Sequence, residues 1–234
     1  MTNPMLAGRT ALVTGATRGI GRAIATELAR AGVRLTLVAR DQRQLEPFAD
    51  ELHAVAIACD VGSSIDCERT LLAMGTAPDI LVNNAGLFVP ASIEETPASD
   101  FEAALAVNLA GPFRIVSAFL PTMRARGRGD IVTIGSIADH TTLPGNAAYG
   151  ASKHGLRALH EVLRAELRGT GVRATLISPG PVDTSLWDDI DPDSREGFTP
   201  RSRMLSPHAV AAAVLFALSQ PPDVDIELVR LSRS

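Results

Sequence analysis

Short apolar runs rich in Val, Ile and Leu alternate along the chain with longer stretches whose apolar residues recur at helical spacing. The runs predict strands at residues 10–14, 33–39, 54–58, 80–82, 131–135, 174–178 and 226–231. The stretches between them predict helices at residues 20–31, 42–53, 63–74, 99–126, 147–169 and 207–219. Because the strand runs are continuous rather than alternating, both of their faces should be buried. The pattern therefore predicts an α/β fold, a doubly wound parallel sheet of about seven strands with helices on both sides.

Two segments break this rhythm where strands are predicted to end. Residues 139–146 form a short loop that contains Gly and Pro, and residues 183–205 are polar and too long for an ordinary connection. Ligands of such sheets bind outside the carboxyl ends of the strands, so we expect both segments beside the site and residues 183–205 as a substrate lid. No linker or repeat interrupts the elements, which predicts one domain across residues 1–234.

Composition and charge exclude several classes of protein. Hydrophobic residues make up 46% of the chain and charged residues 21%, which suits a globular domain with a buried core. The net charge is −4 without any basic run, so neither nucleic acid nor an anionic membrane is expected as a partner. The two cysteines and five histidines lack metal-ligand spacing, and no metal site is predicted. With no signal pattern at the start, and a longest apolar run (209–218) too short to span a bilayer, we expect a cytoplasmic protein.

A glycine-rich turn follows the first predicted strand and leads directly into a helix. Gly15, Gly19 and Gly21 let the chain turn tightly and approach a pyrophosphate, which the helix N-terminus would face. A glycine turn alone also occurs for packing reasons. Here it lies in the strand–turn–helix context that dinucleotide binding requires.

The chain contains one tyrosine and one lysine, Tyr149 and Lys153, whereas the other 21 basic residues are arginine. A spacing of four places both side chains on one face of a helix. There an ammonium group would lower the pKa of a phenol from about 10 and prepare it for general acid/base catalysis. The alternative is a chance pair on the protein surface, of little energetic value.

Several further motifs accompany this pair: Asn83-Asn84-Ala85-Gly86, Asn108, Ser136 and Pro179-Gly180. In their order and spacing, the chain resembles the short-chain dehydrogenases/reductases over roughly residues 8 to 220. The resemblance implies a Rossmann fold, a nicotinamide cofactor and hydride transfer to or from a carbon–oxygen centre. The chain departs from the family at residues 225–234, where many members carry Val-Asp-Gly-Gly.

The resemblance also implies catalytic roles for four residues. Tyr149 would exchange a proton with the substrate oxygen, and Lys153 would lower the pKa of Tyr149 and hold the nicotinamide ribose. Ser136 would polarise the substrate oxygen. Asn108 would anchor a water that connects Lys153 with solvent, unless it serves only packing.

The cofactor site implied by the resemblance is spread over the glycine turn and the ends of later strands. It consists of Gly15, Thr17, Arg18, Gly19, Ile20, Gly21, Arg40, Asp60, Val61, Asn84, Ala85, Gly86, Tyr149, Lys153, Pro179, Gly180, Val182 and Thr184.

The end of the second predicted strand bears on the choice of nicotinamide. NAD enzymes of this fold place an acid there to bind the ribose 2′-hydroxyl, whereas this chain has Ala39 followed by Arg40. Arg18 and Arg40 could bracket a 2′-phosphate with charge-assisted hydrogen bonds. We therefore predict NADP(H) as the preferred cofactor. NAD(H) is the alternative if Asp41 turns into the site, or if both arginines are only solvated surface residues.

These observations predict an NADP-dependent oxidoreductase that interconverts a small ketone and a secondary alcohol, acting as a carbonyl reductase. One alternative is an NAD-dependent dehydrogenase of a hydroxy acid or sugar alcohol; another is a non-catalytic dinucleotide-binding regulator, which the intact set of catalytic residues disfavours. The substrate should lie between residues 137–146 and the lid. Trp187 would contact substrate or fill a gap in its own segment.

The predicted helices 99–126 and 147–169 carry apolar residues on more than one face. Such helices are normally buried on more than one side, which predicts a homo-oligomer. The resemblance agrees, because family members commonly pair these helices about a two-fold axis. A homodimer and a homotetramer both remain open, because the second interface of the family uses the atypical end of the chain.

Overall fold

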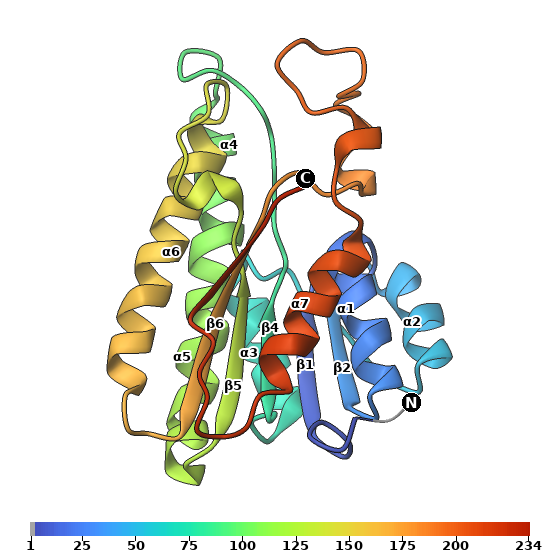
Figure 1. The fold of residues 1–234 in the computed structure, drawn as a ribbon, viewed down its shortest axis with the longest axis vertical. Helices are drawn as coiled ribbons and strands as arrows, with labels where there is room; N and C mark the ends of the chain where they lie inside the picture. Colours follow the sequence, from blue (N-terminus) through green and yellow to red (C-terminus); the bar gives the residue numbers. More distant parts are fainter. Residues whose placement is uncertain (1–2) are drawn as a thin grey trace.

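The computed structural model describes residues 3–234, in which seven strands form one parallel sheet (Figure 1). They are β1 (Thr10–Thr14), β2 (Arg34–Ala39), β3 (Val55–Ala58), β4 (Ile80–Asn83), β5 (Gly129–Ile134), β6 (Val172–Pro179) and β7 (Leu228–Leu231). Their order in the sheet is β3-β2-β1-β4-β5-β6-β7. The predicted doubly wound parallel sheet is confirmed. The order reverses between β1 and β4, and open α/β sheets bind ligands in the crevice at such a point.

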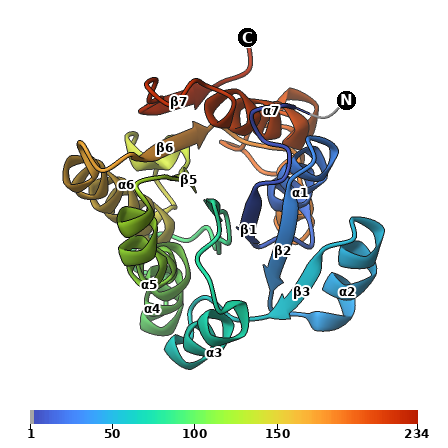
Figure 2. The ribbon, with the colours of Figure 1, turned by 90° about the horizontal axis from the view of Figure 1, so that it is seen from below.

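Helices cover both faces of the sheet (Figure 2). On one side lie α1 (Gly19–Arg30), α2 (Gln42–Glu51) and α7 (Pro207–Leu218), and on the other α3 (Ser64–Met74), α4 (Ala98–Leu105), α5 (Gly111–Arg126) and α6 (Ala147–Leu167). Neighbouring strand residues fill opposite cores: Leu12 packs on the α3–α6 side, and Val13 packs on the α1 side. Burial of both faces is the physical reason for the continuous apolar runs.

The helix predicted at residues 99–126 is interrupted by a π-turn at Ala106–Ala110, between α4 and α5. The turn adds a residue to the helical repeat, and the Asn108 side chain within it is fully buried. Gly111 follows because a Cβ there would lie 2.9 Å from the Val61 carbonyl oxygen. The sequence pattern shows only the apolar periodicity of the segment and therefore misses the break.

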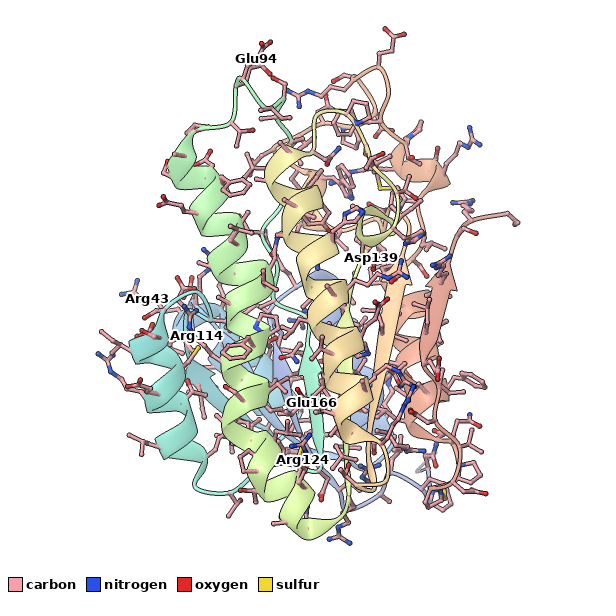
Figure 3. The ribbon with its side chains drawn as sticks, turned by 90° about the vertical axis from the view of Figure 1, so that its left-hand side faces the viewer. Arg43, Glu94, Arg114, Arg124, Asp139 and Glu166 are labelled. Atoms are coloured by element: carbon pink, nitrogen blue, oxygen red, sulfur yellow. The ribbon has the colours of Figure 1, made fainter. Side chains whose placement is uncertain are left out.

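Taken as one helical segment, Ala98–Arg126 is long and apolar enough to cross a membrane, with a window of mean hydropathy 1.6. The sequence analysis expects the longest apolar run to be too short to span a bilayer, whereas this helical segment is long enough. Core helices of soluble proteins pass the same test, and one third of the window is buried inside the fold. In the structure the segment covers the sheet beside α6 (Figure 3), so length and composition are weak evidence for a membrane span.

The polar segment 183–205 rises above the carboxyl ends of the strands (Figure 1). Its two ends are tied together by a bridge between Val182 and Leu205. The end of the chain braces it, because the Arg233 guanidinium donates to the carbonyl oxygens of Ser202 and Met204, the latter at 3.0 Å. The atypical C-terminal sequence therefore supports the segment that is predicted to cover the substrate.

Candidate active site

The glycine turn after β1 packs closely against the loop that follows β4. A Cβ at Gly21 would lie 2.2 Å from the Gly15 carbonyl oxygen, and a Cβ at Gly15 would lie 2.8 Å from the Cα of Ala85. Gly15 also has a φ of +65°, which other residues rarely adopt. The Asn84 side chain donates to the carbonyl oxygens of Thr14 and Gly15, at 2.9 and 3.1 Å. At the N-terminus of α1 the turn therefore has main-chain atoms without side chains at its glycines. This arrangement suits the binding of a pyrophosphate.

A cavity of about 220 Å³ runs from this turn to Tyr149. The predicted site residues that line it are Gly15, Thr17, Arg18, Gly19, Ile20, Arg40, Asp60, Val61, Asn84, Ala85, Gly86, Tyr149, Lys153 and Thr184. The other predicted residues, Gly21, Asn108, Ser136, Pro179, Gly180 and Val182, do not line it. Lining residues that were not among the predicted site residues are Val38, Ala39, Cys59, Leu87, Phe88, Val107, Ile134, Gly135, Ser185 and Leu186. All of them lie within two residues of a predicted site residue, which is the only signal that could have found them.

At one end of the cavity lie two exposed guanidiniums, those of Arg18 and Arg40. Asp41 is occupied elsewhere, because its carboxylate accepts from the Arg43 backbone N–H and from the Gln44 side chain, both at 2.9 Å. It therefore caps α2. This arrangement leaves the cavity without a carboxylate in the position that a ribose 2′-hydroxyl requires.

At the opposite end, Lys153 is buried and its ammonium donates to the Ile134 carbonyl oxygen at 2.9 Å. Burial lowers the pKa of Lys153 to about 8, against the opposing charge of Asp139. The ammonium lies 5.7 Å from the centre of the Tyr149 ring. Burial also raises the pKa of Tyr149; a hydrogen bond with Ser136 lowers it, and the charge of Asp139 raises it. The net shift of the Tyr149 pKa is upward, because desolvation is its largest cause. The lowering by Lys153 stays a prediction, and in this arrangement the ammonium donates to the Ile134 carbonyl oxygen.

The Asn108 amide ties the loop after β4 to α6. Its side chain accepts from the Leu87 backbone N–H at 2.7 Å and donates to the Leu87 carbonyl oxygen at 2.8 Å. The second amide proton goes to the Ser152 hydroxyl at 2.9 Å, and Ser152 in turn donates to the Tyr149 carbonyl oxygen. Both amide protons are used inside the protein, so the side chain has none left to donate to the predicted water.

Three aromatic side chains, Phe88, Trp187 and Phe198, form a row that leads from Tyr149 into the lid segment 183–205. The ring centre of Phe88 lies 4.8 Å from that of Tyr149 and 5.3 Å from that of Trp187. Trp187 is 6.1 Å from Phe198 and donates its indole N–H to the Val182 carbonyl oxygen at 2.9 Å. All of these pairs are edge-to-face. Phe88, Trp187 and Phe198 form an apolar wall, which we call the aromatic wall.

Comparisons with known proteins agree with this geometry. The family model for short chain dehydrogenases matches residues 9–195. An uncharacterized oxidoreductase of Staphylococcus saprophyticus is 36% identical, over 96% of this chain and 97% of its own length. The crystal structure of a metagenomic short-chain oxidoreductase in complex with NADP is 32% identical, with a TM-score of 0.82 over 98% of this chain and 99% of that one. The closed form of a serine dehydrogenase complexed with NADP+ is 30% identical, with a TM-score of 0.87 over 95% and 94%.

Proposed function

The chain belongs to the short-chain dehydrogenase/reductase family of NAD(P)-dependent oxidoreductases. From this we propose that it is a cytoplasmic, NADP(H)-dependent carbonyl reductase that interconverts a small ketone and a secondary alcohol, with Tyr149 as general acid/base. The observation that carries the proposal is the position of Tyr149, which lines the cavity together with the glycine turn and contacts both Ser136 and Phe88.

The protein residues have separate tasks in this mechanism. When bound, the dinucleotide supplies or accepts the hydride. The Tyr149 hydroxyl donates its proton to the substrate oxygen during reduction and removes the hydroxyl proton during oxidation. The Ser136 hydroxyl polarises the same oxygen. Lys153 would hold the ribose hydroxyls of the dinucleotide, and the segment after Val182 would cover the site as a lid and exclude water.

Preference for NADP(H) is supported by charge at the adenosine end of the cavity. Arg18 and Arg40 are exposed beside it, and Asp41 is engaged as the cap of α2. A 2′-phosphate between two guanidiniums would gain charge-assisted hydrogen bonds that a 2′-hydroxyl cannot make. The NADP bound by the related metagenomic oxidoreductase and serine dehydrogenase agrees with this proposal.

Arg40→Ala is expected to weaken NADPH binding by about 10- to 150-fold, equivalent to the loss of a charged hydrogen bond of about 1.5–3 kcal/mol, while NADH binding changes little. Fluorescence titration of both cofactors measures the two affinities. Arg43→Ala is the matched control, since this exposed arginine lies on α2 and does not line the cavity. Equal losses for NADPH and NADH would show that Arg40 does not contact the 2′-phosphate.

The aromatic wall favours an apolar ketone over an anionic substrate. The lid arginine Arg201 is engaged by the Thr184 carbonyl oxygen and by Asp188, so it is not free to bind a substrate carboxylate. The likeness to a serine dehydrogenase supports a second candidate, a hydroxy-acid dehydrogenase. A panel of ketones, alcohols and hydroxy acids, assayed with both cofactors by nicotinamide absorbance, separates the two. Turnover of hydroxy acids alone would refute carbonyl reduction as the main activity.

We further propose that the protein is a homodimer or homotetramer that buries the outward face of α4, α5 and α6 (Figure 3). This face exposes Phe101, Phe113 and Val162, with 39%, 54% and 56% of their surfaces accessible. Apolar side chains of this size on adjoining helices typically mark a contact between subunits.

Light scattering at micromolar concentration is expected to give the mass of at least a dimer, and Phe113→Arg is expected to shift it toward the monomer. In an isologous contact each subunit contributes the same residue, so an arginine at position 113 would place two unpaired charges in the interface. Phe216→Arg, at an equally exposed phenylalanine on α7, is the control and should leave the mass unchanged. A monomeric wild type would show that α4, α5 and α6 need no partner.

A further inference from the structure

The first residues of the proposed lid pack directly against the candidate active site. A Cβ at Gly19, in the glycine turn, would lie 3.0 Å from Thr184 Cγ2, so the lid touches the turn at a residue without a side chain. Thr184 also lines the cavity. Three residues later, the Trp187 ring lies 5.3 Å from that of Phe88. The start of the lid therefore contacts both the glycine turn and the aromatic neighbour of Tyr149.

Arg201, near the end of the lid, ties this start in place. Its guanidinium donates to the Thr184 carbonyl oxygen at 3.2 Å and to the Asp188 carboxylate. It also lies 3.7 Å from the Asp183 carboxylate. Arg201 begins the short helical turn Arg201–Arg203. The position of this turn therefore determines where the start of the lid is held.

The turn Arg201–Arg203 is held from two sides. On one side, the two ends of the lid are joined, because the Asp183 N–H donates to the Leu205 carbonyl oxygen at 2.8 Å. On the other side, the Arg233 guanidinium donates to the carbonyl oxygens of Ser202 and Met204, the latter at 3.0 Å. Among the described residues, Arg233 is the one group outside the lid that donates a hydrogen bond to residues 201–204.

Arg233 is itself placed by the sheet. β7 pairs with β6, and the Gly180 N–H donates to the Leu231 carbonyl oxygen at 2.8 Å. Arg233 follows two residues later, beside the base of the lid (Figure 1). A strand of the sheet therefore supplies the fixed end of the contact, and the lid backbone supplies the end that can move.

We propose that Arg233 is a positioning residue that keeps the lid closed over the active site. It fixes the turn Arg201–Arg203, from which the Arg201 guanidinium reaches Thr184. The consequence for catalysis rests on the proposed function, in which this segment covers the substrate. Without the Arg233 contact, the open form of the lid gains population and substrate is held less firmly. Tyr149 and Ser136 lie outside the lid and keep their places.

Trp187 is the single tryptophan of the chain, so its fluorescence reports the position of the lid without cofactor or substrate. Its ring is packed between Phe88 and Phe198, at 5.3 and 6.1 Å. Arg233→Met keeps an unbranched apolar side chain and removes the hydrogen-bond donors. We expect it to increase the quenching of Trp187 by acrylamide about twofold or more, because two hydrogen bonds of a charged donor are lost.

Arg230→Met is the matched control. It removes an equal charge from an exposed position on β7 and should be quenched like the wild type. Circular dichroism should show the same folded chain in both variants, since both side chains are exposed. Equal quenching in Arg233→Met and the wild type would overturn the proposal, as would an equal increase in the two variants.

Kinetics separates a positioning role from a general loss of structure. In ketone reduction, Arg233→Met should raise KM for the ketone about fivefold or more while kcat stays within about twofold. A loss of folded enzyme would instead lower kcat and leave KM unchanged, and that result would refute the proposal. The quenching measurement needs no turnover. If quenching rises in Arg233→Met but the wild type reduces no ketone, the role of Arg233 in the lid stands and the proposed function fails.

Discussion

Tyr149→Phe is expected to lower kcat by about 10³-fold or more while affinity for NADPH stays within about twofold of the wild type. Phenylalanine keeps the ring that packs edge-on against Phe88 at 4.8 Å. It removes only the hydroxyl, which supplies a proton in the transition state and contributes little to binding in the ground state. The loss should therefore be almost entirely catalytic.

Steady-state kinetics gives kcat, and quenching of the single tryptophan, Trp187, by bound NADPH gives the affinity. Lys153→Arg extends the test, since it keeps a positive charge. A planar guanidinium cannot occupy the buried position from which the ammonium donates to the Ile134 carbonyl oxygen, so activity should fall here too. Turnover near the wild-type rate in Tyr149→Phe would rule out the proposed chemistry.

The fold follows from the sequence because its main signals are local. Continuous apolar runs predict strands buried on both faces, and every strand appears within two residues of its predicted limits. The C-terminal strand illustrates the limit of the approach. Residues 225–234 depart from the family pattern, yet β7 pairs with β6 and Arg233 reaches the lid. Only the folded chain brings residues 202–204 to Arg233.

The site was predictable where a residue type is itself the signal. Three glycines, the single tyrosine and the single lysine occur at spacings that indicate dinucleotide binding and proton transfer, and all except Gly21 line the cavity. Gly21 instead gives the room that the turn needs next to Gly15. Some glycines of the turn therefore line the cavity and another allows the turn to form. The motif alone does not distinguish these two roles.

What the sequence could not predict depends on contacts between distant segments. Phe88 and Trp187 belong to one wall, with ring centres 5.3 Å apart, although 99 positions separate them in the sequence. The relation between Lys153 and Tyr149 is similar. Spacing places them on one helix face, but burial and the Ile134 carbonyl oxygen determine where the ammonium is directed. Helical spacing predicts that Lys153 and Tyr149 are close to each other. The sign of the Tyr149 pKa shift depends on desolvation, which the spacing does not predict.

Acid is expected to destabilise this protein through His160, which α6 buries against β5. Its Nδ1 lies 3.1 Å from the Thr133 hydroxyl, and Nε2 has no hydrogen-bond partner among the described residues. Burial, with a smaller contribution from the Arg164 charge, lowers its pKa to about 4. In the unfolded chain His160 has an ordinary pKa of about 6.5. Between these values the unfolded state binds the additional proton, so the free energy of unfolding falls as the pH decreases.

The pKa difference corresponds to about 3 kcal/mol of stability, present above a pH of about 6.5 and lost by about pH 4. Urea unfolding at fixed protein concentration, at neutral pH and at pH 4, measures it. In His160→Leu/Thr133→Val, which removes both members of the polar pair, the decline should be shallower by about that amount. His208→Asn, at a histidine that is 69% exposed, is the control and should decline like the wild type. If the free energy of unfolding falls equally in the wild type and the double variant, protonation of His160 does not cause the loss of stability. The acid sensitivity would then come from the carboxylates.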